Sequence, residues 1–292
     1  MTSAPRLPIA VIGATGQQGR SVIDALHDAD ADVPVRALVR DPGSSAARAL
    51  RAAGADVVRA DQEDSRSLAD GLAGVASLFY MTTFEGPEGP AGEVRRGHAV
   101  ADAAARANVP HVVYSSVGGA ERKTGIPHFE SKFAVEQRLD ALVPATILRP
   151  TFFMENLAAQ LTPDQDGEIV IRMPMPGDVP MQMIAVRDIG RAAARLLLEP
   201  STIDGRAIEV AGDELTLDVV AAQAGETLGV PARFETIPLE YLGDDEDLKA
   251  MFRWFAGGSS YQADLARSRS LVADVSDLRS WLATQRRHEP AK

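Results

Sequence analysis

The sequence predicts an α/β protein built around a doubly wound parallel sheet, and three observations support this fold class. A short apolar run at residues 9–12 leads into three glycines spaced three apart, Gly13, Gly16 and Gly19, and then into an apolar-periodic segment. Short apolar runs alternate with helix-like segments as far as residue 148, a pattern typical of parallel sheets. The 292 residues are enough to bury a substantial core.

The glycine-rich stretch predicts a dinucleotide site. It lies between a predicted strand and a predicted helix, which is the context that a phosphate-binding fingerprint requires. Glycines let a pyrophosphate approach the backbone without Cβ atoms in the way and lie over the N–H groups that open a helix. The alternative is an ordinary strand-to-helix turn, because Gly-x-x-Gly-x-x-Gly is looser than Gly-x-Gly-x-x-Gly. We favour the dinucleotide because the stretch lies at the start of the chain.

Composition narrows the class of protein. There are 30 basic and 41 acidic residues, a formal net charge of −11, and no cysteine. A net-acidic surface repels a phosphate backbone, so we expect no nucleic-acid partner. Without cysteine there are no disulfides and no thiolate metal sites, and no metal site is predicted. Residues 1–8 contain no apolar leader core, and no apolar stretch reaches the ~18 residues that a bilayer crossing requires. We therefore expect a cytoplasmic protein without a membrane partner.

The end of the second predicted strand, residues 33–39, indicates which cofactor the glycine loop binds. An acid at this point binds the ribose 2′-hydroxyl of NAD, whereas an arginine accommodates the 2′-phosphate of NADP. Arg40 comes first, so NADP(H) is favoured over NAD(H). Asp41 is the competing candidate for NAD, and we interpret it as a turn residue before a proline.

Further strand ends supply candidate site residues. Strands are predicted at residues 55–60, 75–81, 111–115 and 145–148. Doubly wound sheets bind ligands beyond the carboxyl ends of their strands, so Thr82, Thr83 and Phe84 are expected to line the cofactor. Ser115 and Ser116 follow the next strand, where either hydroxyl contacts substrate or nicotinamide, or else caps the chain locally.

A helix predicted to begin at a proline carries the candidate acid–base chemistry. His128 and Lys132 are four residues apart and share one helix face, while Phe129 and Phe133 form the neighbouring apolar stripe. The alternative is structural: Lys132 forms an exposed ion pair with Glu136, four residues on, and His128 is a partly buried polar residue.

The strand–helix alternation weakens beyond residue 157. The remaining elements are predicted at residues 168–172, 186–198, 208–210, 216–228, 234–237 and 276–284. Asp188 lies in the first turn of one helix, where it complements the macrodipole, so we assign it a structural role. Ser276 is expected to cap the last helix, and the aromatics of residues 251–255 are expected to be core.

Together these residues resemble the NmrA-like family over nearly the whole chain, and most closely its NADP-sensing branch. The motifs that carry the resemblance are Gly13-Ala-Thr-Gly16-x-x-Gly19, Val39-Arg40-Asp41-Pro42, Gly54-Ala55-x-Val57-x-x-x-Asp61, Val113-Tyr114-Ser115, His128-Phe129-x-x-Lys132, Phe153-x-Glu155-Asn156-Leu157 and Gly177-Asp178-Val179-Pro180-Met181. The resemblance implies an atypical short-chain dehydrogenase/reductase. It also implies a Rossmann-type domain at residues 1–155, rejoined around residues 182–200, and a smaller C-terminal α/β domain at residues 156–292, with a cleft between them.

The resemblance also implies a role for each part of the site. The glycine loop would bind the pyrophosphate, Arg40 the 2′-phosphate, and Asp61 with Gln62 the adenine. Thr82 and Thr83 would flank the cofactor, and Lys132 would reach the nicotinamide ribose. The loop residues are Gly13, Thr15, Gly16, Gln17, Gln18 and Gly19, and the residues beside the nicotinamide are Ser115, Phe153, Glu155 and Asn156.

Two positions depart from the family pattern. Residues 43–45 are glycine and serines, where the sensing branch carries lysines after its arginine. Catalytic short-chain dehydrogenases use Tyr-x-x-x-Lys, and His128 occupies the tyrosine position here. The sensing branch also has histidine there and is regarded as binding the cofactor without turnover. Histidine is nevertheless able to act as a general acid near neutral pH.

These observations leave more than one function open. The first hypothesis is an NADPH-dependent reductase of a small carbonyl, quinone or enone compound, with Lys132, His128 and Ser116 as catalytic candidates. The alternative is a non-catalytic NADPH/NADP redox sensor that acts through a protein partner, and a third is isomerisation without net redox change. The partner is thus a small-molecule substrate or a protein, and a homodimer is left open.

Overall fold

The computed structural model describes residues 6–258 and 260–285. At its centre lies a seven-stranded, entirely parallel sheet with strand order β10-β6-β5-β4-β1-β2-β3. Its strands are β1 (Ile9–Ile12), β2 (Val35–Val39), β3 (Asp56–Arg59), β4 (Ser77–Met81), β5 (Val112–Ser115), β6 (Ala145–Pro150) and β10 (Ala207–Val210). The order reverses between β1 and β4, so the predicted doubly wound fold class is confirmed.

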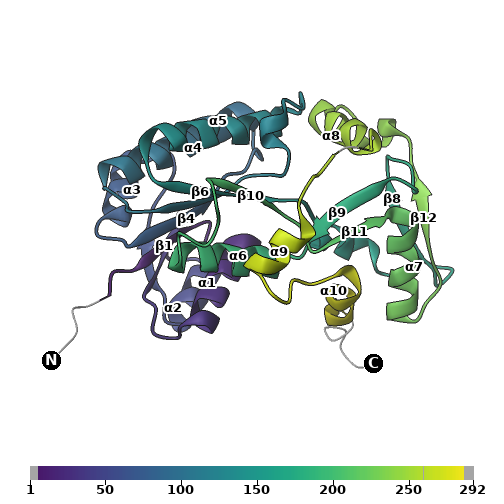
Figure 1. The fold of residues 1–292 in the computed structure, drawn as a ribbon, viewed down its shortest axis with the longest axis horizontal. Helices are drawn as coiled ribbons and strands as arrows, with labels where there is room; N and C mark the ends of the chain where they lie inside the picture. Colours follow the sequence, from purple (N-terminus) through teal and green to yellow (C-terminus); the bar gives the residue numbers. More distant parts are fainter. Residues whose placement is uncertain (1–5, 259, 286–292) are drawn as a thin grey trace.

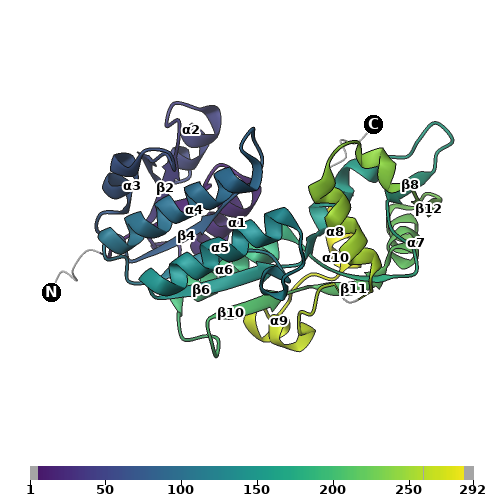
Figure 2. The same ribbon diagram turned by 90° about the horizontal axis from the view of Figure 1, so that it is seen from above.

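Helices cover both faces of this sheet (Figures 1 and 2). One face carries α1 (Gln17–Ala29), α2 (Ser45–Ala52) and α6 (Val186–Leu198), and the other carries α3 (Ser65–Leu72), α4 (Gly89–Arg106) and α5 (Pro127–Leu142). Neighbouring strand residues point to opposite faces, so Val11 and Phe79 pack in one core and Ala10 and Tyr80 in the other. A sheet buried on both faces requires near-continuous apolar strands, which is why the alternation was visible in the sequence.

Two late segments of the chain complete this sheet layer. Strand β10 pairs with β6, and helix α6 lies against α1. A Cβ on Gly190 of α6 would lie 2.3 Å from Ser21 Oγ and 2.5 Å from the Ser21 carbonyl carbon, so glycine permits this close approach of the helices. Ser21 Oγ also donates a hydrogen bond to the Val186 carbonyl at 3.1 Å. The predicted boundary after residue 155 stays a prediction.

The other elements form what we call the second lobe, at the right of Figure 1. It contains β7 (Phe152–Phe153), β8 (Ile169–Met173), β9 (Pro180–Ile184), β11 (Asp213–Thr216), β12 (Ala232–Thr236), α7 (Leu217–Leu228), α8 (Glu246–Ala256), α10 (Leu278–Gln285) and the 3₁₀ turns η2 (Met154–Gln160) and η3 (Leu239–Leu242). Two small sheets, β11-β9-β7 and β12-β8, share a core with these helices. Phe255 is only 1% exposed there, in agreement with the core role predicted for its aromatic stretch.

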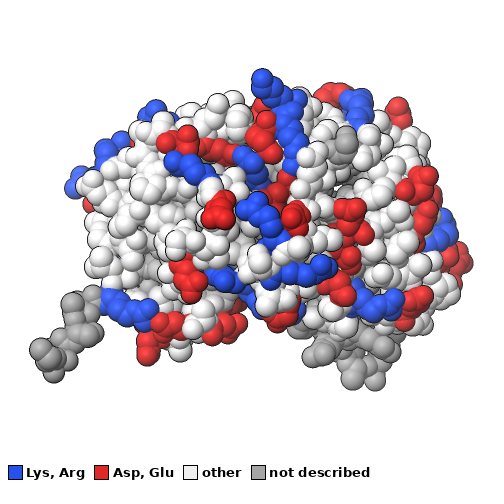
Figure 3. Space-filling model, viewed as in Figure 1, with Lys and Arg blue, Asp and Glu red and all other residues white. Residues whose placement is uncertain are grey.

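Two short elements lie where the sheet layer meets the second lobe. Helix α9 (Leu265–Leu271) packs its last residue into the core beneath α6, and η1 (Ala120–Arg122) follows β5. Among the described residues, none of the helices combines the length and the apolar character needed to cross a bilayer. Acidic and basic side chains are interspersed over the face seen in Figure 3, without a continuous basic stripe.

The last helix differs from its prediction at the cap. It begins at Leu278, and Asp277 Oδ1 accepts the Ser280 N–H at 2.8 Å, so the expected cap at Ser276 is wrong. Ser276 Oγ instead accepts a hydrogen bond from Arg187 Nε at 3.1 Å, and its own N–H donates to Asp188 Oδ2 at 2.8 Å. Asp188 is fully buried, which agrees with its predicted structural role.

Candidate functional site

The glycine loop lies at the point where the strand order reverses. Gly13 follows β1 with φ of +77°, a conformation that favours glycine, and its carbonyl accepts the Gly16 N–H at 2.9 Å. Gly16 is the N-cap of α1, no side chain caps the helix, and its first turn contains no acidic residue. The opening N–H groups of α1 and its positive dipole end therefore suit an anion.

The space around the loop fits a pyrophosphate. A Cβ on Gly19 would lie 2.2 Å from the Gly13 carbonyl oxygen, so only glycine lets α1 start this close to β1. A Cβ on Gly16 would lie 3.3 Å from the same oxygen. Thr15, Gly16 and Gln17 are exposed, so the outer side of the loop is open to a ligand.

Arg40 and Asp41 differ in whether their side chains are already engaged. Asp41 Oδ1 accepts the Gly43 N–H at 2.8 Å, which confirms the turn role predicted for this residue. Arg40 is exposed directly after β2, and within the described part of the chain its guanidinium has no hydrogen bond or ion pair. Ser44 caps α2 by accepting the Ala47 N–H at 3.2 Å. Of these two side chains after β2, Arg40 is the one without a partner among the described residues, and it carries a positive charge.

The residues expected beside the adenine and the nicotinamide differ in exposure and in hydrogen bonding. Asp61 is half-buried, and its Oδ1 accepts the Glu63 N–H at 3.0 Å, while Gln62 is half-buried without a side-chain hydrogen bond to the described residues. Phe153 is half-buried in β7, and Asn156 is exposed in η2.

Glu155 joins three elements of the structure. Its Oε2 accepts the Val186 N–H and its Oε1 accepts the Trp281 indole N–H, both at 3.0 Å. Burial raises the pKa of the Glu155 carboxyl above its ordinary value. This side chain ties η2 to α6 and α10, while its predicted place beside the nicotinamide stays a prediction.

A buried cluster surrounds Lys132. Its Nζ lies 2.6 Å from Oε1 of Glu93, a fully buried residue of α4, and donates to the Thr82 carbonyl at 3.0 Å. Thr82 Oγ1 donates to Glu93 Oε1 at 2.8 Å and lies 2.8 Å from the Tyr114 hydroxyl, and the Ser131 hydroxyl donates to Glu93 Oε2. The expectations from the sequence did not include Glu93, whose carboxylate organises this cluster.

Glu136 is not the partner of the lysine, so that structural alternative is wrong. Glu136 is buried, accepts the Ser116 hydroxyl at 2.5 Å and lies 2.6 Å from Arg149 Nη2. The cause is competition from other partners, because Lys132 bonds to Glu93 of α4 and to the Thr82 carbonyl, whereas Glu136 bonds to Ser116 and Arg149 at the ends of β5 and β6. Ser115 is also engaged, because its hydroxyl donates to Gln18 Oε1 at 2.7 Å and links β5 to α1.

Thr83 and Phe84 lie in the loop after β4. Thr83 is exposed, and its Oγ1 accepts the Glu85 N–H at 3.1 Å. Phe84 is half-buried and stacks on His128 with ring centroids 4.5 Å apart and an interplanar angle of 25°. The loop after β4 therefore reaches the helix that carries the candidate acid–base residues.

His128 is clamped between aromatic rings and a carboxylate. Phe129 contacts the imidazole in an edge-on arrangement with ring centroids 4.8 Å apart, whereas Phe84 stacks on it. Nδ1 lies 2.7 Å from Oδ1 of Asp247, in the first turn of α8, whereas Nε2 has no hydrogen-bond partner among the described residues. Burial lowers the pKa of His128 below its ordinary value, although the Asp247 carboxylate acts in the opposite direction.

Comparison with known proteins identifies the family. The profile of the NmrA-like family matches residues 6–280. The chain belongs to the NmrA-like family. An NmrA-like family domain-containing oxidoreductase of Cladobotryum is 30% identical over 277 residues, which cover 84% of this chain and 82% of the relative. The resemblance inferred from the sequence is therefore confirmed at the level of the family.

Two solved structures share the fold of this NmrA-like protein. Quinone oxidoreductase 2 of Escherichia coli is 30% identical over 234 residues, covering 78% of this chain and 77% of the relative. Its NADPH complex has a TM-score of 0.77 at 26% identity and covers 94% of this chain and 99% of the other. NmrA, described as a negative transcriptional regulator, was solved with NAD and has a TM-score of 0.79 at 23% identity, covering 96% and 95% of the two chains.

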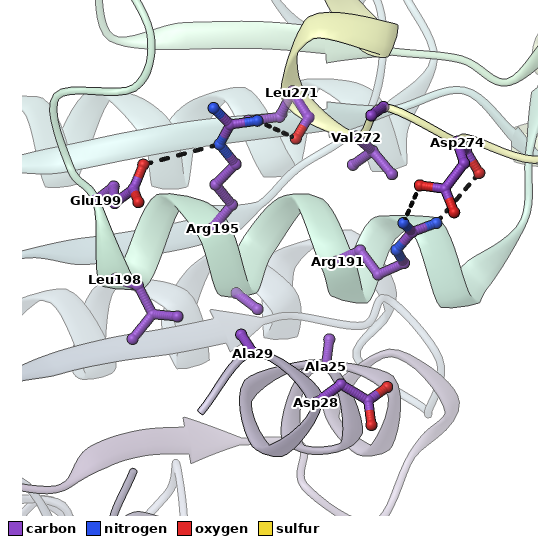
Figure 4. Close-up of a pocket in the computed structure, with 12 residues that line it drawn as sticks. Ala25, Asp28, Ala29, Arg191, Arg195, Leu198, Glu199, Leu271, Val272 and Asp274 are labelled. Carbon is purple, nitrogen blue, oxygen red and sulfur yellow. Dashed lines mark hydrogen bonds and ion pairs between the residues drawn. The ribbon is translucent and has the colours of Figure 1, made fainter. Parts of the chain in front are cut away.

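Two cavities of this NmrA-like protein lie away from the glycine loop. One of about 430 Å³ lies between α1, α6 and α9 (Figure 4), and one of about 620 Å³ is lined by residues at the amino ends of β1 and β4. In the first, Arg191 is paired with Asp274, and Arg195 donates to the Leu271 carbonyl at 3.0 Å. These arginines are engaged within the protein, and neither cavity is lined by a predicted site residue.

Proposed function

We propose that this NmrA-like protein is an NADPH-dependent oxidoreductase that reduces a small quinone, enone or carbonyl compound. The observation that carries the proposal is the placement of two acid–base side chains one helical turn apart on α5. The imidazole of His128 stacks on Phe84, and its Nε2 has no partner among the described residues. The names of the relatives support it, since they include oxidoreductases and an NADPH-dependent quinone oxidoreductase.

Different residues would bind different parts of the cofactor. Bound NADPH would supply a hydride to the substrate. The open N-terminus of α1 suits its pyrophosphate, and the guanidinium of Arg40, which has no partner in the part of the chain that the structure describes, suits its 2′-phosphate. The Lys132 ammonium has three N–H groups, and among the described residues it uses two of them, for Glu93 and Thr82, so one donor is left for a ribose hydroxyl. Phe84 shields His128 from water on one face.

The first test is turnover. Purified full-length protein should oxidise NADPH in the presence of at least one member of a panel of quinones, enones and aldehydes, monitored by the absorbance of the reduced nicotinamide. NADH at the same concentration should support less turnover. If no compound in a broad panel accelerates NADPH consumption over the rate without substrate, the proposed activity is wrong.

Arg40→Ala should remove the preference for NADPH. We expect KM for NADPH to rise about 10- to 100-fold, because a hydrogen bond to a charged group contributes about 1.5–3 kcal/mol. KM for NADH, which lacks the 2′-phosphate, should change little. Arg106→Ala removes a cation at the far end of α4 and is the matched control. Equal changes in KM for both cofactors would mean that Arg40 attracts either cofactor through its charge and does not bind the 2′-phosphate.

One observation favours the sensor as a second candidate. Lys132 is already bonded to Glu93 and to the Thr82 carbonyl, and histidine occupies the position of the catalytic tyrosine. A sensor should consume no NADPH, yet it should change its oligomeric state, homodimer formation included, or its binding of a protein partner between NADPH and NADP⁺. Sedimentation velocity with each cofactor form measures the first of these. Identical behaviour with NADPH, with NADP⁺ and without cofactor would eliminate this candidate.

A further inference from the structure

We propose that His128 and Asp247 form the proton-delivering pair of this site, with His128 as the catalytic acid and Asp247 as its positioning residue. The inference rests on the proposed reductase function and deepens it, because it assigns the proton of the reaction. Asp247 comes from α8 of the second lobe and lies 119 residues from His128 in the sequence.

The contacts of Asp247 fix the orientation of the imidazole. Its Oδ1 is 2.7 Å from His128 Nδ1 and also accepts the His128 main-chain N–H at 3.3 Å. Helix α5 has no cap of its own, since its N-cap residue Ile126 makes no side-chain hydrogen bond and Pro127 follows. The carboxylate from α8 therefore serves as an inter-lobe cap and as the acceptor for Nδ1. A carboxylate only accepts, so Nδ1 carries the proton and Nε2 is left for the substrate.

The surroundings restrict the ring further. Phe84 stacks on one face of the imidazole and Phe129 meets it edge-on, while the side chain of His128 is only 8% exposed. Asp247 Oδ2 is buried and has no hydrogen-bond partner within the described part of the chain. Such an acceptor is costly unless a donor reaches it, so it is suited to a hydroxyl of a substrate.

Charged groups from three helices decide the protonation of His128. Asp247 from α8 and Glu93 from α4 favour the imidazolium, whereas Lys132 on α5 and burial disfavour it. The balance holds the pKa below its ordinary value of 6.5. The neutral ring, with a lone pair on Nε2, is therefore the main form near neutral pH, and the proton-donating form increases as the pH falls.

The proposed step balances as follows. The substrate receives a hydride on carbon from NADPH, the C=O or conjugated π bond breaks, and its electron pair moves to oxygen. The imidazolium transfers its Nε2 proton to this oxygen, which leaves neutral His128, NADP⁺ and an alcohol from a simple carbonyl compound, or an enol from an enone or a quinone. The enol then tautomerises to the saturated ketone or to the hydroquinone. A proton from solvent then restores the imidazolium. Reduction should therefore be fastest below the pKa of His128 and should slow as the pH rises through it.

The experiment combines NMR and kinetics on the full-length protein. Isotope-labelled histidine reports the tautomer and pKa of each ring, and His128→Gln assigns the signal. We expect neutral His128 in wild type to carry its proton on Nδ1. Asp247→Asn should lower the pKa of His128 by on the order of one unit and populate the Nε2–H tautomer. Asp244→Asn, an exposed acid of the preceding turn, should change neither.

Kinetics then link the pair to turnover. His128→Gln should lower kcat for quinone reduction about 10²-fold at acidic pH, as expected for loss of a general acid. Asp247→Asn should move the fall in kcat towards lower pH by the same shift that NMR measures. An unchanged tautomer and pKa in Asp247→Asn, or an unshifted rate profile despite a shifted pKa, would overturn the inference. If wild type consumes no NADPH, the reductase function itself fails. Normal turnover by His128→Gln refutes only the proton assignment.

Discussion

Replacing Lys132 by methionine is expected to lower the free energy of unfolding by about 3–5 kcal/mol, because removing one partner of a buried ion pair leaves the other charge uncompensated. Glu93 is fully buried, and Lys132 is its only cationic partner in the described structure. The hydroxyls of Thr82 and Ser131 still donate to the carboxylate but carry no charge. Urea denaturation at neutral pH measures the change through the midpoint.

Two further variants test whether the loss comes from the buried charge. Lys132→Met combined with Glu93→Gln contains neither charge and should recover a large part of the stability, because Gln keeps the shape and hydrogen-bonding oxygen of Glu93. Lys249→Met breaks an ion pair with Glu246, whose side chain is 70% exposed, and should cost no more than about 1 kcal/mol. If the double variant is less stable than the single one, the pair is not the cause of the loss.

Local features of the site could be predicted from the sequence. The strand, the turn at Gly13 and the helix α1 depend on neighbouring residues, and the structure has all three where the glycine spacing indicates them. The turn at Asp41 is also local, since the acceptor and the Gly43 N–H are two residues apart. Such features follow from backbone conformation and short hydrogen bonds, which a single stretch of sequence specifies.

The partners of the acid–base residues could not be predicted in the same way. Glu93 is 39 residues from Lys132, and its role depends on how α4 packs on α5. In the sequence, Asp247 is one of four consecutive acidic residues at 244–247, and its contact with His128 requires α8 to meet α5. The spacing of Lys132 and Glu136 suggested an ion pair, but each side chain bonds instead to a partner on another element, Glu93 for Lys132 and Arg149 for Glu136. Side chains that meet through packing leave no periodic signal in the sequence.

Alanine at Gly19 and at Gly16 should separate folding from cofactor binding. The Cβ of Gly19→Ala would lie 2.2 Å from the Gly13 carbonyl oxygen and 2.9 Å from Ala14 Cα, so α1 must move away from the loop. We expect a loss of about 1–3 kcal/mol or more in stability, as for other overpacked sites. A displacement of about 1 Å at the opening N–H groups should weaken NADPH binding by roughly 10²-fold.

Gly16→Ala is the matched variant, because its effect should fall on the ligand. Gly16 has φ of −86° and ψ of 173°, which alanine adopts, and its Cβ would lie 3.3 Å from the Gly13 carbonyl oxygen. Stability should fall by no more than about 1 kcal/mol, the usual loss at an N-cap. The added methyl group would lie on the exposed side of the loop, where we expect the pyrophosphate. NADPH should therefore bind more weakly than to wild type. Thermal unfolding with and without NADPH measures both effects, since a ligand that binds the folded state raises the midpoint. Stabilisation of Gly16→Ala by NADPH equal to that of wild type would mean that the pyrophosphate does not approach this loop.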